Sequence, residues 1–162
     1  MAFIVFFIYD CIFFLGLLLY LPFYAFRKKI TLAALREKFG LVLIPKESTS
    51  CIWIQVVSVG EAILIEALVR RLKETFTYPI VISTTTLTGN KIARKKYASM
   101  AHVIFFPFDF SLVVDTVIRK LKPRLFIAVE TEIWPNLFYN LKQFIFPYHF
   151  IYQAPPSWHD FL

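Results

Sequence analysis

The chain has 162 residues, of which 58% are hydrophobic and 19% aromatic, with a formal net charge of +7 and two cysteines. This composition excludes a largely disordered chain. The cysteines provide neither a disulfide framework nor a zinc-binding spacing, and the three separated histidines show no ligand pattern, so we predict no metal site. No nucleic-acid-binding signature is present, which disfavours DNA or RNA as a partner.

The N-terminal run at residues 2–26 contains one formal charge, Asp10, among aliphatic and aromatic residues. About 20 apolar residues in a helix cross the hydrocarbon core of a bilayer, so this run predicts a single transmembrane anchor. The basic residues 27–29 follow directly, and the positive-inside rule places the rest of the chain on the cytoplasmic side. A cleaved signal peptide and a buried core helix are the weaker alternatives, because the charges follow the run and the run is long. We expect Asp10 to reach the outer interface of the bilayer, which is favoured over a buried role.

Residues 27–50 are predicted to form a juxtamembrane segment that contains a short amphipathic helix and ends in a linker. Apolar residues recur on one face of the helix at 31–39, and Gly40 ends it. The charged residues Glu37 and Lys38 fall largely on the opposite face. This helix is expected to lie near the membrane.

Short apolar runs alternate with segments of helical spacing from residue 51 to residue 151. The predicted elements are strands at 51–57, 80–85, 102–106, 125–129 and 148–151, and helices at 61–75, 88–99, 111–120 and 136–144. This alternation is typical of βαβ crossovers, so we predict an α/β fold with a Rossmann-like parallel sheet over 51–151. In the first of these helices, the residues expected to face inward are Ile63, Ala67, Leu68 and Leu72. Ligands of such sheets bind at the carboxyl ends of the strands, which makes the loops there the candidate site.

The loop after the first strand carries Ser58, Gly60 and Glu61. Ser58 and Glu61 have the spacing of a capping box, which is a structural role. Gly60 is unfavourable in the first turn of a helix, and a glycine there lets a substrate approach the backbone closely. A glutamate beside that opening is a candidate general base, and the sequence leaves both roles of Glu61 open.

The loop after the second strand is rich in hydroxyl groups, with Thr84, Thr85, Thr86 and Thr88 followed by Gly89. Hydroxyl groups next to a helix N-terminus can hold a phosphate or a sugar oxygen. The same run also fits an ordinary helix cap at Thr86 or Thr88, and the pattern does not decide between these roles.

The loop after the fourth strand carries Glu130, Glu132, Trp134 and Asn136. Two carboxylates two residues apart share one face if the strand continues. A helix N-terminus favours acidic residues, but this explains one glutamate better than two and gives Trp134 no role. The capping role therefore leaves part of this pattern unexplained. The sequence has no Gly-rich dinucleotide fingerprint, Walker loop or GxSxG elbow.

Several of these stretches together resemble the 3-deoxy-D-manno-octulosonic acid (Kdo) transferases of lipopolysaccharide assembly. The matching stretches are IWIQ at 52–55, SVGE at 58–61, TTTLTG at 84–89, PFD at 107–109, KPRL at 122–125 and ETEIWPN at 130–136. The SVGE element and the ETEIWPN element are specific as a pair. Many members of this family also begin with a single membrane anchor.

The resemblance implies the N-terminal half of a two-domain GT-B glycosyltransferase at the bacterial inner membrane, with its catalytic side cytoplasmic. Such enzymes move Kdo from CMP-Kdo to the lipid A precursor without a metal or another cofactor, and the N-terminal half holds the lipid acceptor. Glu61 would be the general base. The residues that would bind the acceptor or line the cleft are Ser58, Gly60, Thr84, Thr85, Thr86, Gly89, Glu130, Glu132, Trp134 and Asn136.

The resemblance fades after residue 151, and residues 152–162 form a divergent tail where family members continue into a donor domain. We expect a truncation or a shifted reading frame, so this chain alone would be inactive unless a separate donor domain is its partner. The alternatives are a non-functional remnant and a non-enzymatic, membrane-tethered α/β module. That module would bind anionic lipid or a partner protein through a basic face. The face comprises Lys91, Arg94, Lys95 and Lys96, and the alternative is that these residues are only a solvated surface.

Overall fold

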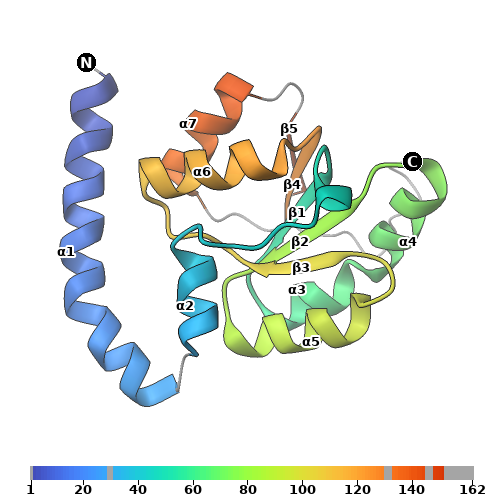
Figure 1. Ribbon diagram of the computed structural model, residues 1–162, viewed down its shortest axis with the longest axis horizontal. Helices are drawn as coiled ribbons and strands as arrows, with labels where there is room; N and C mark the ends of the chain where they lie inside the picture. The colour runs from blue at the N-terminus through green and yellow to red at the C-terminus, as the bar shows by residue number, and fades with distance from the viewer. Residues whose placement is uncertain (1, 29–30, 130–132, 145–147, 152–162) are drawn as a thin grey trace.

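The computed structural model describes residues 2–28, 31–129, 133–144 and 148–151. A parallel sheet lies between two layers of helices, and a long N-terminal helix runs along one side (Figure 1). The strands are β1 (Ile52–Val56), β2 (Ile80–Thr84), β3 (His102–Phe105), β4 (Leu125–Val129) and β5 (Tyr148–Ile151). Their order in the sheet is β3-β2-β1-β4-β5, and every neighbouring pair is parallel. The predicted α/β fold with a parallel sheet is confirmed.

The two faces of the sheet carry separate apolar cores. Helices α6 (Ser111–Leu121) and α7 (Pro135–Phe144) cover one face, which packs around Trp53 and Phe126. Helices α3 (Val59–Leu64), α4 (Glu66–Thr75) and α5 (Leu87–Tyr97) cover the other face, which packs around Ile54 and Tyr97. Because both faces are covered, the strands read as continuous apolar runs rather than as alternating ones.

The helix predicted at 61–75 is in fact two helices, because the backbone turns at Ile65 between α3 and α4. The break changes which residues meet the sheet. Ile63 is 50% exposed and Ala67 is exposed, so the expectation that both face inward is wrong. Leu68 and Leu72 are buried as expected, together with Ala62, Ile65 and Val69.

Helix α2 (Leu32–Lys38) confirms the short helix predicted at 31–39, and it lies between α1 and the sheet (Figure 1). Gly40 ends it with φ of +76°, a left-handed conformation that favours glycine. Two charged residues of α2 are turned towards the strands, whereas Arg36 is exposed. Glu37 accepts a hydrogen bond from the backbone N of Phe105 at the end of β3, and Lys38 is 5% exposed. These contacts join residues far apart in the sequence, so helical spacing alone does not reveal them.

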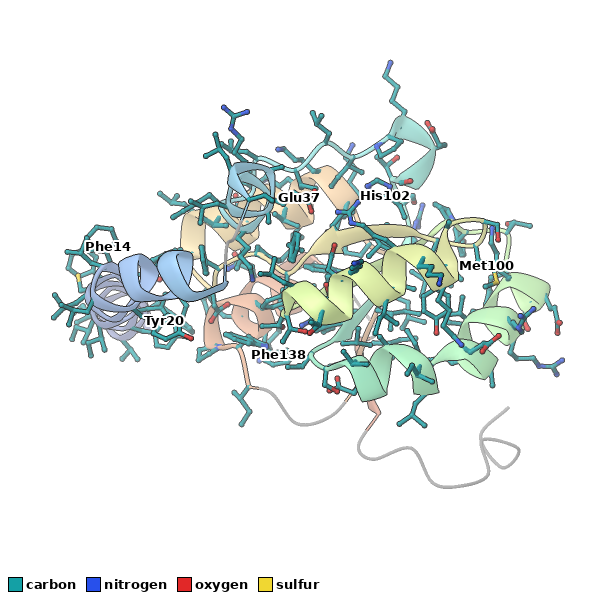
Figure 2. All side chains as sticks on the ribbon, turned by 90° about the horizontal axis from the view of Figure 1, so that it is seen from below. Phe14, Tyr20, Glu37, Met100, His102 and Phe138 are labelled. Carbon is teal, nitrogen blue, oxygen red and sulfur yellow. The ribbon has the colours of Figure 1, made fainter. Side chains whose placement is uncertain are left out.

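Helix α1 (Ala2–Lys28) lies beside the α/β domain (Figure 1). Its side chains point both towards the domain and away from it (Figure 2), and one stripe of them packs against the domain. The ring of Phe6 lies 4.3 Å from that of Tyr139 in α7, and the ring of Phe13 lies 5.0 Å from that of Phe110, measured between centroids. Residues three to four positions apart share one face of a helix, so this stripe is continuous. Most other described apolar side chains of α1 are more than half exposed.

Asp10 belongs to the inward stripe of α1. Its carboxylate accepts hydrogen bonds from Ser111 Oγ at 2.6 Å and from Asn136 Nδ2 at 2.7 Å. The expectation that Asp10 reaches the outer interface of a bilayer is therefore wrong, because the first turns of α6 and α7 offer it donors. Among the residues that the structure describes, no helix has both the length and the apolar character needed to cross a membrane. The anchor predicted at 2–26 is thus not confirmed.

Candidate functional site at the carboxyl ends of the strands

Glu61 stands at the start of α3, directly after β1. Its carboxylate accepts hydrogen bonds from the backbone N–H of Val57 at 2.7 Å and of Ser58 at 3.0 Å, while Ser58 Oγ accepts from the N–H of Glu61. This is a complete capping box, so the structural role left open by the sequence is present. The Glu61 side chain is also buried, at 2% exposure.

The two glycines of the predicted site meet different surroundings. A Cβ atom on Gly60 would lie 3.7 Å from Ser58 Oγ, which is ordinary contact, and the residue is exposed. A Cβ atom on Gly89 would lie 2.8 Å from Thr86 Oγ1 and 3.6 Å from the backbone of Ser58. The fold therefore requires a glycine at 89, where α5 approaches the β1–α3 loop, and does not require one at 60.

The threonines after β2 divide into structural and exposed roles. Thr86 caps α5, since its Oγ1 accepts from the N–H of Gly89 at 3.1 Å, which settles the choice between Thr86 and Thr88. Thr84 is fully buried and accepts from Asn90 Nδ2 at 2.9 Å. Thr85 is partly exposed and lines a cavity, and Thr88 is exposed on the surface. Of this run, Thr85 is the member that lines the cavity.

The acidic loop after β4 is placed only in part, because Glu130 and Glu132 lie outside the described residues. Asn136 does not line the cavity but is 99% buried. Its backbone N–H and that of Leu137 donate to the carboxylate of Asp109, at 3.1 and 2.9 Å. Asp109 thus caps the first turn of α7. The PFD and WPN elements of the family resemblance meet in this contact.

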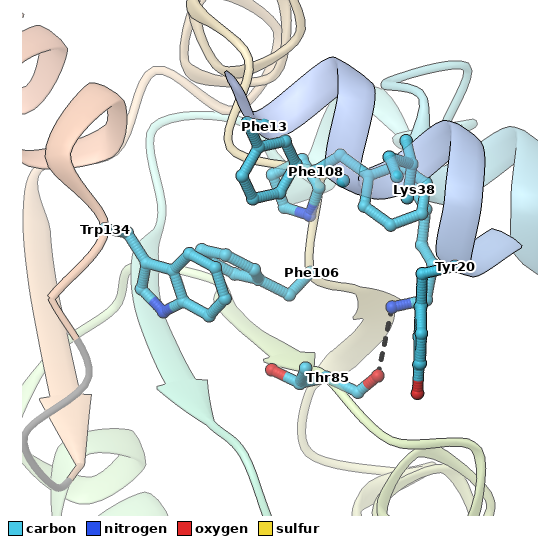
Figure 3. Close-up of a pocket in the computed structure, with 10 residues that line it drawn as sticks. Phe13, Tyr20, Lys38, Thr85, Phe106, Phe108 and Trp134 are labelled. Atoms are coloured by element: carbon cyan, nitrogen blue, oxygen red, sulfur yellow. Dashed lines mark hydrogen bonds between the residues drawn. The ribbon is translucent and has the colours of Figure 1, made fainter. Parts of the chain in front are cut away.

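A cavity of about 370 Å³ opens where α1 and α2 approach the carboxyl ends of β2, β3 and β4 (Figure 3). The loops contribute Thr85, Pro107 and Phe108, with Phe106 beneath and Trp134 at one side. The other wall comes from α1 and comprises Phe13, Gly16, Leu17 and Tyr20. The rings of Phe106 and Trp134 contact each other in a tilted arrangement, with centroids 5.0 Å apart and an interplanar angle of 44°.

Lys38 is the charged residue in this lining. Its Nζ donates to the backbone oxygen of Thr85 at 3.0 Å and lies 5.4 and 5.5 Å from the ring centroids of Phe105 and Phe108 (Figure 3). No carboxylate pairs with it among the described residues. Burial without a counter-ion lowers the pKa of Lys38 from 10.5 to about 8.

Sequence reasoning did not identify the α1 wall or Lys38 as part of a site. Lys38 reads as a solvent-facing residue of an amphipathic helix, and only the docking of α2 against the strand ends buries it. Pro107 and Phe108 belong to the PFD element of the resemblance, which was the one signal available for this part of the lining.

The remaining side-chain clusters are weaker candidates for a functional site. The described residues contain no group of three or more His, Cys, Asp or Glu side chains placed to hold a metal ion. In the basic cluster on α5, Arg94 pairs with Glu37 at 3.1 Å and Lys96 pairs with Glu66 at 2.5 Å. These two cations form ion pairs within the chain, whereas Lys91 and Lys95 are exposed and form none of the ion pairs found among the described residues.

Comparison with known proteins fits this arrangement of loops. Residues 33–151 match the profile of the 3-deoxy-D-manno-octulosonic-acid transferase (kdotransferase) family. The chain belongs to the Kdo transferase family. A bifunctional glycosyltransferase/methyltransferase of Fusobacterium nucleatum is 42% identical over 88 residues, which cover 53% of this chain and 14% of that protein.

Two annotated Kdo transferases extend the comparison. The 3-deoxy-D-manno-octulosonic acid transferase of Haemophilus influenzae is 33% identical over 91 residues, covering 56% of this chain and 21% of that protein. The Chlamydophila psittaci enzyme of the same name is 27% identical over 144 residues, covering 85% of this chain and 33% of that protein. The match to these relatives therefore spans between about a seventh and a third of their length.

Proposed function

We propose that this Kdo transferase chain is the acceptor-side half of a GT-B glycosyltransferase of lipopolysaccharide assembly. Its reaction would transfer Kdo from CMP-Kdo to the lipid A precursor, with a donor-binding half supplied elsewhere. The observation that carries the proposal is the β1–α3 loop of the family domain, where buried Glu61 stands beside a glycine that the fold does not require.

Glu61 is the proposed general base. Each carboxylate oxygen accepts one backbone N–H, and a carboxylate oxygen has room for a second donor. The capping box therefore orients the carboxylate and leaves each oxygen able to accept a further hydrogen bond, from which it could take a proton. The exposed, open side at Gly60 is the direction from which an acceptor hydroxyl would approach.

The same proposal places the chain on the cytoplasmic side of the bacterial inner membrane, attached through α1. Its support is the outward face of α1, where large apolar side chains such as Phe7, Ile12 and Leu19 are more than half exposed. Exposed apolar patches of this kind mark membrane or protein contacts. We propose that this face lies against the bilayer while Asp10 keeps the opposite face on the domain.

The base assignment is tested in a chimera that joins residues 1–151 of this chain to the donor-binding half of the Haemophilus influenzae relative. Glu61→Gln keeps the side-chain length and one carbonyl acceptor for the backbone. Transfer of Kdo to the lipid A precursor should fall by about 100-fold or more, which is the usual worth of a positioned general base. Circular dichroism should show an intact fold.

Glu66→Gln is the matched control, because Glu66 is a neighbouring glutamate that binds Arg70 and Lys96 at the protein surface. Its transfer rate should stay near that of the parent chimera. Unchanged turnover in Glu61→Gln would remove Glu61 from the mechanism and favour the capping role alone.

A further inference from the structure

Three side chains with hydrogen-bonding groups, Trp53, Ser83 and Gln55, form a polar row in the apolar core beneath the strand-end loops. Trp53 and Gln55 lie two residues apart on β1 and therefore on the same face of the sheet, and Ser83 of β2 is the register partner of Gln55. All three are at most 2% exposed. Apolar side chains of the same shape would be nearly neutral for stability, so the fold alone does not require polar groups here.

The hydrogen bonds of the polar row run in one direction. The indole N–H of Trp53 can only donate, and it donates to Ser83 Oγ at 2.7 Å. The Ser83 hydroxyl donates in turn to Gln55 Oε1, and Gln55 Nε2 donates to Thr85 Oγ1 at 3.1 Å. A reversed carboxamide would take away the acceptor of the Ser83 hydrogen at a fully buried position. Trp53 therefore sets the orientation of the Gln55 amide through Ser83.

The polar row ends on the hydroxyl group of Thr85. Because Gln55 donates to Thr85 Oγ1, the hydroxyl keeps its own hydrogen, which reaches no acceptor among the residues that the structure describes. The backbone oxygen of Thr85 accepts from Lys38 Nζ at 3.0 Å (Figure 3). Thr85 is thus held from two sides, and it is also partly exposed and lines the cavity. Its hydrogen is available to an oxygen atom that a ligand brings.

We propose that Trp53, Ser83 and Gln55 are positioning residues that hold the Thr85 hydroxyl as a hydrogen-bond donor to an oxygen atom of the glycolipid acceptor. The proposal deepens the proposed function, because it rests on the acceptor-side role of this half of the enzyme. The three residues act only through Thr85. A hydroxyl whose direction is fixed before binding loses less rotational freedom when the acceptor arrives, and the bonds behind it polarise its hydrogen.

The test measures the affinity of the full chain for the lipid A precursor, presented in dodecyl maltoside micelles. Thr85→Val keeps the shape of the side chain and removes the hydroxyl, and it should weaken binding by about five- to tenfold, as expected for one lost hydrogen bond. Thr85→Ser keeps the hydroxyl and should bind as wild type does. Equal affinity of wild type and a folded Thr85→Val variant would overturn the proposal.

Gln55→Glu reverses the last bond of the polar row without changing its shape. An ionised carboxylate only accepts hydrogen bonds, so it takes the hydrogen of Thr85, whereas a protonated carboxyl group can still donate as the amide does. The variant should therefore bind as wild type does while its carboxyl is protonated, and more weakly once it is ionised. Lys38 holds the backbone of Thr85 and titrates with a pKa of about 8, so each variant is compared with wild type at the same pH.

The double variant Gln55→Glu, Thr85→Val separates positioning from a general effect on the fold. If Gln55 acts through Thr85, the glutamate adds no further loss of affinity once the hydroxyl is gone. Ser83→Ala gives the same comparison without burying a charge. It lets the carboxamide of Gln55 turn over, so it should weaken binding in the wild-type background and not in Thr85→Val. Losses that add up in these double variants would contradict the role of the polar row.

Asn90→Asp is the matched control. Asn90 Nδ2 donates to Thr84 Oγ1 at 2.9 Å, and the two residues are 3% and 0% exposed. The variant makes the same amide-to-carboxyl change beside the neighbouring threonine, which a ligand does not reach. Thermal unfolding reports its cost to the fold, and the folded protein should bind the precursor as wild type does. A loss of affinity equal to that of Gln55→Glu would count against the proposal, since any buried carboxylate would then have this effect.

These measurements require neither sugar transfer nor a donor-binding half. The affinity of Thr85→Val reports on the contact with the acceptor, whereas Glu61→Gln reports on the transfer step. The polar row can therefore fail its test while Glu61 passes its own, and the reverse.

Discussion

Gly60 in α3 and Gly89 in α5 both lie close to Ser58, yet we expect opposite effects when each becomes alanine. Gly60→Ala places a methyl group in open space and improves helix propensity, so the fold should be unchanged or stabilised by up to about 1 kcal/mol. Gly89→Ala pushes the Thr86 hydroxyl from its capping position and should destabilise the fold by about 1–2 kcal/mol.

Thermal unfolding compares the stability of the two alanine variants. The rate of Kdo transfer in the chimera then distinguishes an effect on function from an effect on the fold. Because the methyl group of Gly60→Ala obstructs the approach to Glu61, transfer should drop while the unfolding midpoint holds. Full transfer in Gly60→Ala would show that the acceptor does not pass over this residue.

Lys38 should make the stability of the chain depend on pH. Its pKa is lowered in the folded state from 10.5 to about 8, so between these values the unfolded chain holds a proton that the folded chain has released. The penalty for burying the ammonium is complete below about pH 8 and is relieved as the pH rises towards 10.5. The contribution of Lys38 to the free energy of unfolding therefore increases with pH in this window, by up to about 3 kcal/mol.

The pH effect is measured as the difference in unfolding midpoint between wild type and Lys38→Met. Any advantage of the methionine variant should shrink as the pH is raised from 7 through this window. Lys73→Met, which removes an exposed lysine, corrects for the general effect of a lost charge. A constant difference between wild type and Lys38→Met would contradict the burial of a charged side chain.

At the scale of elements, Asp10 holds α1 on the domain through polar contacts, beside the hydrogen bond that the Tyr9 hydroxyl donates to Asp109 at 3.0 Å. Asp10→Ala removes the acceptor shared by Ser111 and Asn136, which should weaken the docking of α1 by about 1–3 kcal/mol. Spin labels on the exposed Cys11 and on Thr116→Cys of α6 report the separation of the two helices. We expect a longer and broader distance distribution in Asp10→Ala.

Glu74→Ala removes a surface carboxylate of α4 that lies 3.7 Å from Arg71, so it controls for lost charge. Its distance distribution should match that of the parent. An unchanged distribution in Asp10→Ala as well would mean that the Tyr9–Asp109 hydrogen bond and the aromatic contacts of Phe6 and Phe13 are sufficient to hold the helix.

The elements themselves follow well from local patterns. All five predicted strands and the helix at 136–144 appear close to their expected bounds, because apolar runs, Pro135 and the capping residues act over a few positions. The break at Ile65 and the burial of Lys38 do not follow, since each depends on what the helix packs against. Packing partners lie far apart in the chain, and helical periodicity carries no information about them.

At the scale of the whole molecule, the outward face of α1 predicts binding to uncharged membranes. The double variant Leu15→Glu, Leu19→Glu places two carboxylates on this face and should reduce co-flotation with phosphatidylcholine vesicles by at least about tenfold, since burying a charge in hydrocarbon costs several kcal/mol. Leu112→Glu, at an exposed position of α6, should bind as the parent does.

Salt separates this proposal from a module that binds lipid through its basic face. Apolar contact with neutral vesicles should persist in high salt, whereas binding through Lys91 and Lys95 to anionic vesicles would weaken as charges are screened. Binding restricted to anionic vesicles and lost in salt would favour the non-enzymatic alternative.

At this scale, the sequence predicts that the loops of the site lie together, but it predicts their chemistry only in part. Parallel strands end at one edge, so the loops at 58–61, 84–89 and 133–136 were bound to lie near each other. The sequence could not show that Asn136 faces Asp109 and Asp10 rather than a cleft. It also could not place an α1 wall on the cavity, because that contact joins the first helix to loops more than 60 residues later.

The contact between Asp10 and Asn136 joins residues separated by 126 positions, and this separation has a consequence for synthesis. A ribosome adds about 5–20 residues per second, so α1 is complete roughly ten seconds before the residue that finally holds it has been made. Until Phe110 and Ser111 have been made, the inward stripe of α1 lacks these partners within the nascent chain. The domain can therefore hold the helix only late in synthesis.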